Sequence, residues 1–267
     1  MTSSESGHGG GMDAGHDYHT AAAMLVWQYD LGATEAMLDA PLNRYELPEA
    51  AQTRPKAEPA PVAMPAAADP VAVARAMAAA ADSLAGLQAA LAGFDLCDLK
   101  RGAKSTVFAD GSPAARVMVI GEAPSREEDI EGKPFAGRAG QLLDRMFAAI
   151  GLLRGHDNSG TGLYVLNALP WRPMRDPDAA QMAMLQPFLE RHVQLAAPDV
   201  IVVMGNTPLQ MVAGRSGISR CRGQWTTGFD RPVLPMLHPD QLLRNPSAKR
   251  EAWADLLALK AWLRGQA

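Results

Sequence analysis

Three polar side chains come at the ends of short apolar stretches, where they are able to do chemistry. Glu122, Asn167 and His238 bring a carboxylate, an amide and an imidazole, and Phe135 stands on an expected loop between them. A carboxylate can position a water, an imidazole can donate a hydrogen bond to a leaving group, and a rigidly held aromatic ring suits a flat ligand. Each residue alone has an ordinary structural explanation, such as a helix cap or a satisfied histidine, but the four together favour a reaction site.

The elements that must position these residues follow from the apolar pattern. Strands are expected at 115–121, 163–169, 199–205 and 232–237, and helices at 71–92, 140–150, 181–196, 207–213 and 248–263. This alternation predicts an α/β fold with three layers (α/β/α), in which helices cover both faces of a central four-stranded parallel sheet. Ligands bind outside the carboxyl ends of such strands, so the candidate residues are expected at one edge of the sheet.

The chain divides into four parts by composition. Residues 1–19 are rich in glycine, histidine and serine and predict a disordered tail, although metal binding by its three histidines is a weaker alternative. Residues 20–40 have helical periodicity and predict an N-terminal helical extension. Residues 41–70 are a linker rich in proline and alanine, and 71–267 are expected to form the α/β domain.

Composition and charge exclude several classes of protein. The 267 residues are 48% hydrophobic, which is enough for one sizeable core, and neither a signal peptide nor a membrane span is expected. Cys97 and Cys221 are too few for a disulfide framework and indicate a cytoplasmic location. The net charge is −4, but residues 211–267 hold nine Lys or Arg against four Asp or Glu, a local excess that suits contact with DNA.

Three longer motifs carry a resemblance to a known family. They are GEAPSREEDIEGKPFAGRAGQLLD at 121–144, VLNALPWRP around Asn167 and HPDQLLRNPSAKREAW at 238–253. Across residues 96–263 the chain resembles the uracil-DNA glycosylases, most closely family 4, and the early helix MLVWQYDLGATEAML is similar to an extension of proteobacterial members. The resemblance implies the uracil-DNA glycosylase fold and a monofunctional N-glycosyl hydrolase that removes uracil from DNA and initiates base-excision repair.

The resemblance also implies a role for each candidate. Glu122 is expected to position or activate the attacking water and to face the sugar cation, and His238 to donate a hydrogen bond toward uracil O2. Phe135 is expected to stack on the uracil ring, and Asn167 to read its Watson–Crick edge. A base in a duplex must be flipped out to reach such a pocket, at a cost of about a few kcal/mol. The expected pocket is completed by Ala123 and Pro124.

Contacts with the rest of the DNA are expected after His238. Leu242, four residues further on, is expected to fill the vacated base stack, with support from Leu243. The alternative for both leucines is ordinary core packing at the start of a helix. If Leu242 fills the base stack, its apolar side chain must be exposed on the surface.

Phosphate contacts are expected from positive side chains and from a turn. Arg244, Lys249 and Arg250 are expected to meet phosphates, as are the backbone amides near Ser125. Two residues depart from the family pattern, which usually has glycine at Ser125 and a small residue at Asp240. An aspartate at that position would repel a phosphate, which bears on the strength of DNA binding.

The cofactor prediction rests on the cysteines. Family 4 members carry a four-iron, four-sulfur cluster on four cysteines, and the corresponding positions here are Phe94, Cys97, Trp171 and Leu185. One thiolate cannot hold such a cluster, so the chain is expected to have no cofactor and no metal. The three large apolar replacements are expected to fill the cluster's volume.

Two functions from different classes stay open at this point. The first is an active glycosylase whose partner is uracil-containing DNA; the second is a catalytically weak or inactive DNA-binding paralogue. The active glycosylase is favoured because the chain has all four candidate residues: Glu122, Phe135, Asn167 and His238. A nucleotide-binding enzyme is disfavoured because no GxGxxG follows the first strand, and no lysine is placed for strand cleavage. No membrane partner or obligate protein partner is expected, and the protein is expected to be a monomer.

Overall fold

The computed structural model describes residues 18–32, 69–156, 158 and 160–265. The chain separates into two units, Met1–Ala63 and Met64–Ala267. In the first unit helix α1, Tyr18–Asp30, carries exposed apolar side chains that include Met24, Leu25 and Trp27. The helix expected within 20–40 is thus present up to Asp30. Residues 1–17 of the predicted disordered tail and residues 41–68 of the predicted linker lie outside the described residues.

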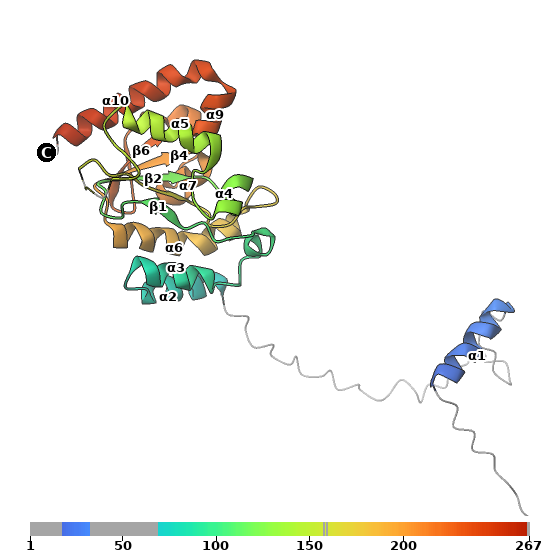
Figure 1. The fold of residues 1–267 in the computed structure, drawn as a ribbon. Helices are drawn as coiled ribbons and strands as arrows, with labels where there is room; N and C mark the ends of the chain where they lie inside the picture. The colour runs from blue at the N-terminus through green and yellow to red at the C-terminus, as the bar shows by residue number, and fades with distance from the viewer. Residues whose placement is uncertain (1–17, 33–68, 157, 159, 266–267) are drawn as a thin grey trace, which may run out of the picture. The chain divides into compact units, whose positions relative to one another are not determined.

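The second unit is built on a six-stranded sheet with strand order β1-β3-β2-β4-β6-β5 (Figure 1). Its central strands are parallel and confirm the predicted four-stranded sheet: β3 (Tyr164–Asn167), β2 (Val117–Gly121), β4 (Val200–Met204) and β6 (Arg231–Met236). Strands β1 (Ala109–Gly111) and β5 (Thr226–Gly228) pair antiparallel at the two edges. The sequence did not predict them, because strands of three residues are too short to form an apolar run.

Helices cover both faces of this sheet (Figure 1). Successive residues of one strand contact opposite sides. Met118 and Ile120 of β2 belong to the core cluster formed with α2 (Pro70–Ala80), α3 (Leu84–Ala92), α6 (Ala179–Ala196) and α7 (Asn206–Ala213). Val117 and Val119 pack instead with α5 (Gly137–Ala148) and α10 (Lys249–Gly265). Because both faces are buried, the strands have continuous apolar sequences, and the three-layer prediction is confirmed.

Capping residues explain where the helices begin. The single helix expected over 71–92 is two helices, because Ser83 accepts a hydrogen bond from the backbone of Gly86 and starts α3 after α2 has ended. Asp178 starts α6 through a reciprocal capping box with Gln181. The remaining short elements are η2 (Asp98–Gly102), α4 (Arg126–Glu131), α8 (Ile218–Cys221), α9 (Pro239–Arg244) and η3 (Pro246–Ala248).

The four parallel strands end side by side, so the residues that follow them lie at one edge of the sheet. Gly121 of β2 is the register partner of Asn167 of β3, and Met204 of β4 is the partner of Met236 of β6. Polar side chains after these positions form the site described below. Among the described residues, no helix combines the length and the apolar character needed to cross a membrane.

Candidate active site

Glu122 is the first residue after β2, and the start of α7 holds its carboxylate. Glu122 Oε1 accepts a hydrogen bond of 2.9 Å from the backbone N–H of Asn206, the first residue of that helix. Gly205, immediately before it, has a φ of 112°, and a Cβ there would lie 2.3 Å from Glu122 Cγ. Only glycine leaves this space, so Gly205 lets the carboxylate sit against the positive end of a helix.

Asn167 and Phe135 meet above Gly121. A Cβ on Gly121 would lie 2.6 Å from Asn167 Oδ1 and 2.6 Å from Phe135 Cζ. The amide oxygen and the tip of the aromatic ring therefore occupy adjacent positions over the end of β2. Both residues are buried. Because the ring and the amide are adjacent, a flat ligand stacked on the ring would also be within reach of the amide.

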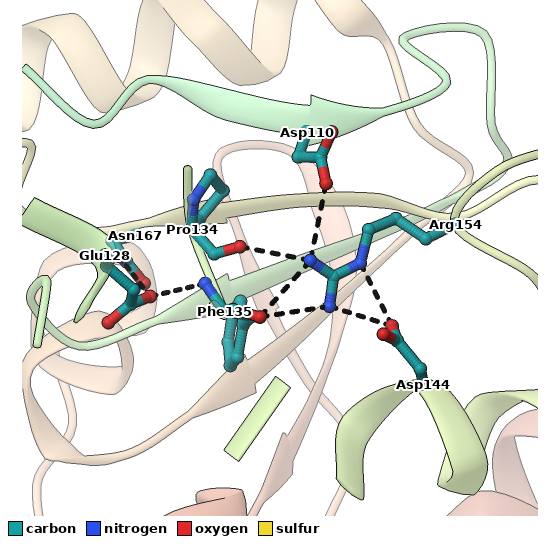
Figure 2. Close-up of polar contacts among 7 residues, drawn as sticks. All are labelled: Asp110, Glu128, Pro134, Phe135, Asp144, Arg154 and Asn167. Carbon is teal, nitrogen blue, oxygen red and sulfur yellow. Dashed lines mark hydrogen bonds and ion pairs between the residues drawn. The ribbon is translucent and has the colours of Figure 1, made fainter. Parts of the chain in front are cut away.

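Phe135 has a backbone conformation that is rare for an aromatic residue, with a φ of 52°. Hydrogen bonds hold the loop on both sides of this residue (Figure 2). Its N–H donates to Glu128, and Arg154 donates to the carbonyl oxygens of Pro134 at 3.1 Å and Phe135 at 3.4 Å. Strained backbone of this kind persists only where the surroundings over-determine it, as they do here.

Arg154 is itself held by two carboxylates. It lies 2.8 Å from Asp144 on α5 and 3.4 Å from Asp110 on β1, and its side chain is 15% exposed (Figure 2). Gly140 completes the packing, because a Cβ there would collide with the carbonyl oxygen of Phe135. The backbone that carries the aromatic ring is thus fixed by Arg154, which lies 19 positions from Phe135 in the sequence.

His238 follows β6 and begins α9. Its Nδ1 accepts a hydrogen bond of 3.3 Å from the backbone N–H of Asp240, and its ring lies 5.6 Å from that of Phe135 between centroids. Burial lowers the pKa of His238, although the nearby carboxylates of Asp240, Glu122 and Glu128 act in the opposite direction. A neutral imidazole that accepts at Nδ1 carries its proton at Nε2, so His238 is prepared to donate from that atom.

A cleft of about 470 Å³ opens beside these residues, a size ordinary for ligand sites. Its walls include the predicted site residues Ala123, Ser125, Phe135, His238 and Arg244. Pro124 is buried next to them. Glu122 and Asn167 do not line the cleft, but Asn167 lies beside Phe135 and Glu122 is near enough to His238 to act on its charge. The cleft is also lined by Glu127, Glu128, Ala136, Arg138, Ala139, Asp240 and Leu243.

The structure bears on two of the DNA-contact predictions. Leu242 is fully buried, because its side of α9 packs onto the domain, whereas Leu243 is partly exposed and lines the cleft. The backbone N–H of Ser125 donates to Glu128 Oε2, so that amide is already occupied, although the Ser125 hydroxyl keeps a proton to donate. This burial favours the core-packing alternative for Leu242.

The other cationic predictions divide between two surfaces. Arg244 lines the cleft, whereas Lys249 lines a different, largely apolar groove between α5 and α10. Arg250 is exposed on α10. Arg138, at the start of α5, lines the cleft and was not predicted, since its surrounding sequence had been assigned only to the loop of Phe135.

Two other residues of the site were also missed. Glu128 has a visible sequence signal, because Ser125 and Glu128 form the spacing of a capping box. Arg154 has no such sequence signal, since its partners lie on α5, on β1 and in the loop of Pro134, and only the folded chain brings them together.

The comparisons with known proteins bear on the same stretch of chain. The family described as the uracil DNA glycosylase superfamily matches residues 108–257. The chain belongs to this superfamily. The matched range contains Glu122, Phe135, Asn167 and His238, so the resemblance inferred from the three motifs is confirmed.

Individual relatives are similar over most of their own length. The type-4 uracil-DNA glycosylase of Saccharolobus solfataricus is 32% identical over 175 residues, which cover 61% of this chain and 79% of the relative. The corresponding protein of Archaeoglobus fulgidus is 33% identical over 172 residues, covering 60% and 82%. That of Thermotoga maritima is 35% identical over 158 residues, covering 57% and 78%.

The iron–sulfur cluster implied by family 4 does not fit the residues of this superfamily member. The resemblance places the four cysteines at the positions of Phe94, Cys97, Trp171 and Leu185. Each of these residues is 1% exposed, and all four lie within one core cluster. Burial raises the pKa of the Cys97 thiol, the reverse of what a metal-binding thiolate needs. In the part of the chain that the structure describes, no group of three or more His, Cys, Asp or Glu is arranged to hold a metal.

Proposed function

We propose that this protein is a monofunctional uracil-DNA glycosylase, which hydrolyses the N-glycosidic bond of uracil in DNA and so begins base-excision repair. The observation that carries the proposal is the convergence of Glu122, Phe135, Asn167 and His238 at one edge of the sheet, beside a cleft that Phe135 and His238 line. A binding protein would have no need of a carboxylate and a neutral imidazole held near a stacking ring.

The reaction follows from the chemistry of these groups. The flipped uracil stacks on Phe135, and Asn167 pairs with its N3–H and O4. As the bond between N1 and C1′ breaks, its electron pair passes to the uracil ring, and His238 Nε2–H stabilises the charge on O2. Glu122 faces the sugar cation and takes a proton from the water that bonds to C1′. Return of this proton from Glu122 to the uracil anion, through solvent, gives uracil and an abasic deoxyribose and restores the carboxylate.

DNA contacts are proposed around the cleft mouth. Leu243, and not Leu242, is the apolar side chain proposed to occupy the gap left by the flipped base, because it is the leucine that reaches the cleft. Arg244 and Arg138 are proposed to meet phosphates, with the Ser125 hydroxyl as a further donor. Lys249 and Arg250 remain candidates for phosphates further along the strand.

The proposed enzyme works without an iron–sulfur cluster. Support comes from Phe94, Trp171 and Leu185, whose side chains are packed together with Cys97 in the core where sulfur ligands would be needed. The indole N–H of Trp171 donates to the hydroxyl of Thr106 at 3.0 Å, so the tryptophan is a satisfied part of this core. The monomeric state and the cytoplasmic location stay predictions from the sequence.

Single-turnover excision from a uracil-containing oligonucleotide tests the proposal. The wild type is expected to release uracil, and Glu122→Ala to lose about 100- to 10,000-fold of the rate while still binding the oligonucleotide. The matched control is Glu127→Ala, which removes another carboxylate at the cleft but is expected to keep most activity. A wild type that binds DNA and releases no uracil would establish the alternative, a DNA-binding paralogue.

A further inference from the structure

Glu128 is a carboxylate that contacts both residues expected to hold the base. It is 7% exposed, and its Oε1 accepts hydrogen bonds from Asn167 Nδ2 at 3.2 Å and from the backbone N–H of Phe135 (Figure 2). Its other oxygen accepts from the backbone N–H of Ser125. Both oxygens are thus engaged by N–H donors, so Glu128 is fixed in place from three directions.

This contact determines which way the Asn167 amide faces. A carboxylate only accepts hydrogen bonds, so Asn167 must present Nδ2 to Glu128; the reversed amide would bring two oxygens together in a buried place. With Nδ2 turned to Glu128, Oδ1 lies over Gly121 beside the tip of the Phe135 ring. The amide oxygen is therefore offered on the side where a stacked base would present its edge.

Uracil and cytosine differ at the edge that this amide meets. Uracil offers an N3–H donor and an O4 acceptor, whereas cytosine offers an N3 acceptor and an N4 amino donor. An amide that can rotate freely by half a turn could match either base. An amide held by Glu128 matches uracil and sets Oδ1 against the bare N3 of cytosine.

We propose that Glu128 is the positioning residue that sets the choice of uracil over cytosine, because it fixes the orientation of the Asn167 amide. This inference rests on the proposed function, since it concerns the base bound in the same site. Glu128 does not contact the base; it acts through Asn167 and, by way of the backbone, through Phe135.

Glu128→Gln is the direct test, because a neutral amide of the same length can donate as well as accept. The probes are two oligonucleotides that carry 2′-fluoro-deoxyuridine or 2′-fluoro-deoxycytidine at one position, since the fluorine suppresses cleavage by destabilising the sugar cation. The wild type is expected to bind the uracil probe more tightly. In Glu128→Gln the ratio of the two affinities is expected to fall about tenfold, and cytosine excision to become measurable.

The matched control is Asp129→Asn on the same helix. Asp129 is equally buried, at 4% exposed, but its carboxylate accepts from the backbone N–H groups of Lys104 and Ser105 and pairs with Arg172. Its loss is expected to lower the melting temperature and to leave the preference for uracil unchanged. A role of Glu128 in stability alone would make the two variants behave alike.

A second measurement does not depend on the variant folding. In the wild type, hydrogen exchange of the Asn167 side-chain N–H that faces Glu128 is expected to be much slower than that of the exposed Asn245 side chain. Equal exchange rates would overturn the inference. So would a folded Glu128→Gln protein with an unchanged uracil preference while the wild type excises uracil. A wild type that excises no uracil and binds both probes equally would overturn the proposed function itself.

Discussion

Replacing Arg154 with methionine tests whether a distant side chain holds the stacking ring in place. The change keeps an unbranched side chain as far as the position of Nε and removes the guanidinium, which donates to the carbonyl oxygens of Pro134 and Phe135 and pairs with Asp110 and Asp144. Each lost bond to a carbonyl costs about 1 kcal/mol. The partners Asp110 and Asp144 are 32% and 50% exposed, so each ion pair adds only about 0–1 kcal/mol.

Together these contributions amount to about 2–4 kcal/mol of unfolding free energy. For a domain of this size that corresponds to a melting temperature lower by roughly 5–15 °C. The left-handed backbone of Phe135 costs about 1–2 kcal/mol, so the loop is expected to relax once its carbonyl is released. A shift of the ring by about 1 Å is expected to slow uracil excision by about 10- to 100-fold.

Thermal unfolding followed by circular dichroism and single-turnover excision at 25 °C, where the variant is still folded, separate the two effects. Arg154→Lys is the matched control, because it keeps the charge near Asp110 and Asp144 but has no planar fork for both carbonyls. We expect its melting temperature to be only partly restored, because the ion pairs contribute less than the carbonyl contacts, and its excision rate to stay low. An Arg154→Met protein that melts within about 2 °C of the wild type and excises uracil at the same rate would refute the reasoning.

Three further predictions concern the wedge, acid stability and the cofactor. Leu243→Ala is expected to slow excision from a duplex more than excision from a single strand. Leu242→Ala is expected to lower the unfolding free energy by about 2–5 kcal/mol. If the two variants slowed excision from a duplex equally, the assignment of Leu243 as the wedge would be contradicted. Burial lowers the pKa of His192 to about 4, so between pH 6.5 and pH 4 the unfolded state binds a proton that the folded state does not. The free energy of unfolding is therefore expected to fall by about 3 kcal/mol as the pH is lowered from above 6.5 toward 4. Urea unfolding should show a flatter pH dependence in His192→Gln, and an unchanged dependence would exclude the histidine as the cause. The purified protein is expected to contain no stoichiometric iron and no broad absorbance near 400 nm, as metal analysis and spectroscopy can check.

The parallel sheet could be predicted because its strands are buried on both faces. Val117 to Ile120 are all apolar, since alternate residues face two different helical layers, and such runs are visible in a linear sequence. The edge strands β1 and β5 could not be predicted, because pairing with a neighbour, and not apolar content, makes them strands. The break between α2 and α3 depended on Ser83, a single capping residue within an alanine-rich stretch.

The candidate site also has features that the sequence predicts and features that depend on the folded structure. Asn167 ends a strand, and Glu122 and His238 follow strands, so topology alone brings all three to one edge. Whether a leucine after His238 points outward depends on the angle at which α9 packs, and this decides between Leu242 and Leu243. A shift of one residue around a helix turns a side chain by about 100°, which no pattern of leucines resolves.

The kinds of residue that line the site, and the edge of the sheet at which they meet, were determined by the order of residues along the chain. The tertiary structure decided how those residues are held: the left-handed turn of Phe135, the contact of Glu128 with Asn167, and the reach of Arg154 to the backbone beside the ring. The reason is physical. Apolar periodicity is a property of neighbours in the sequence, whereas a hydrogen bond between α4 and β3 joins residues 39 positions apart and exists only when the chain is folded.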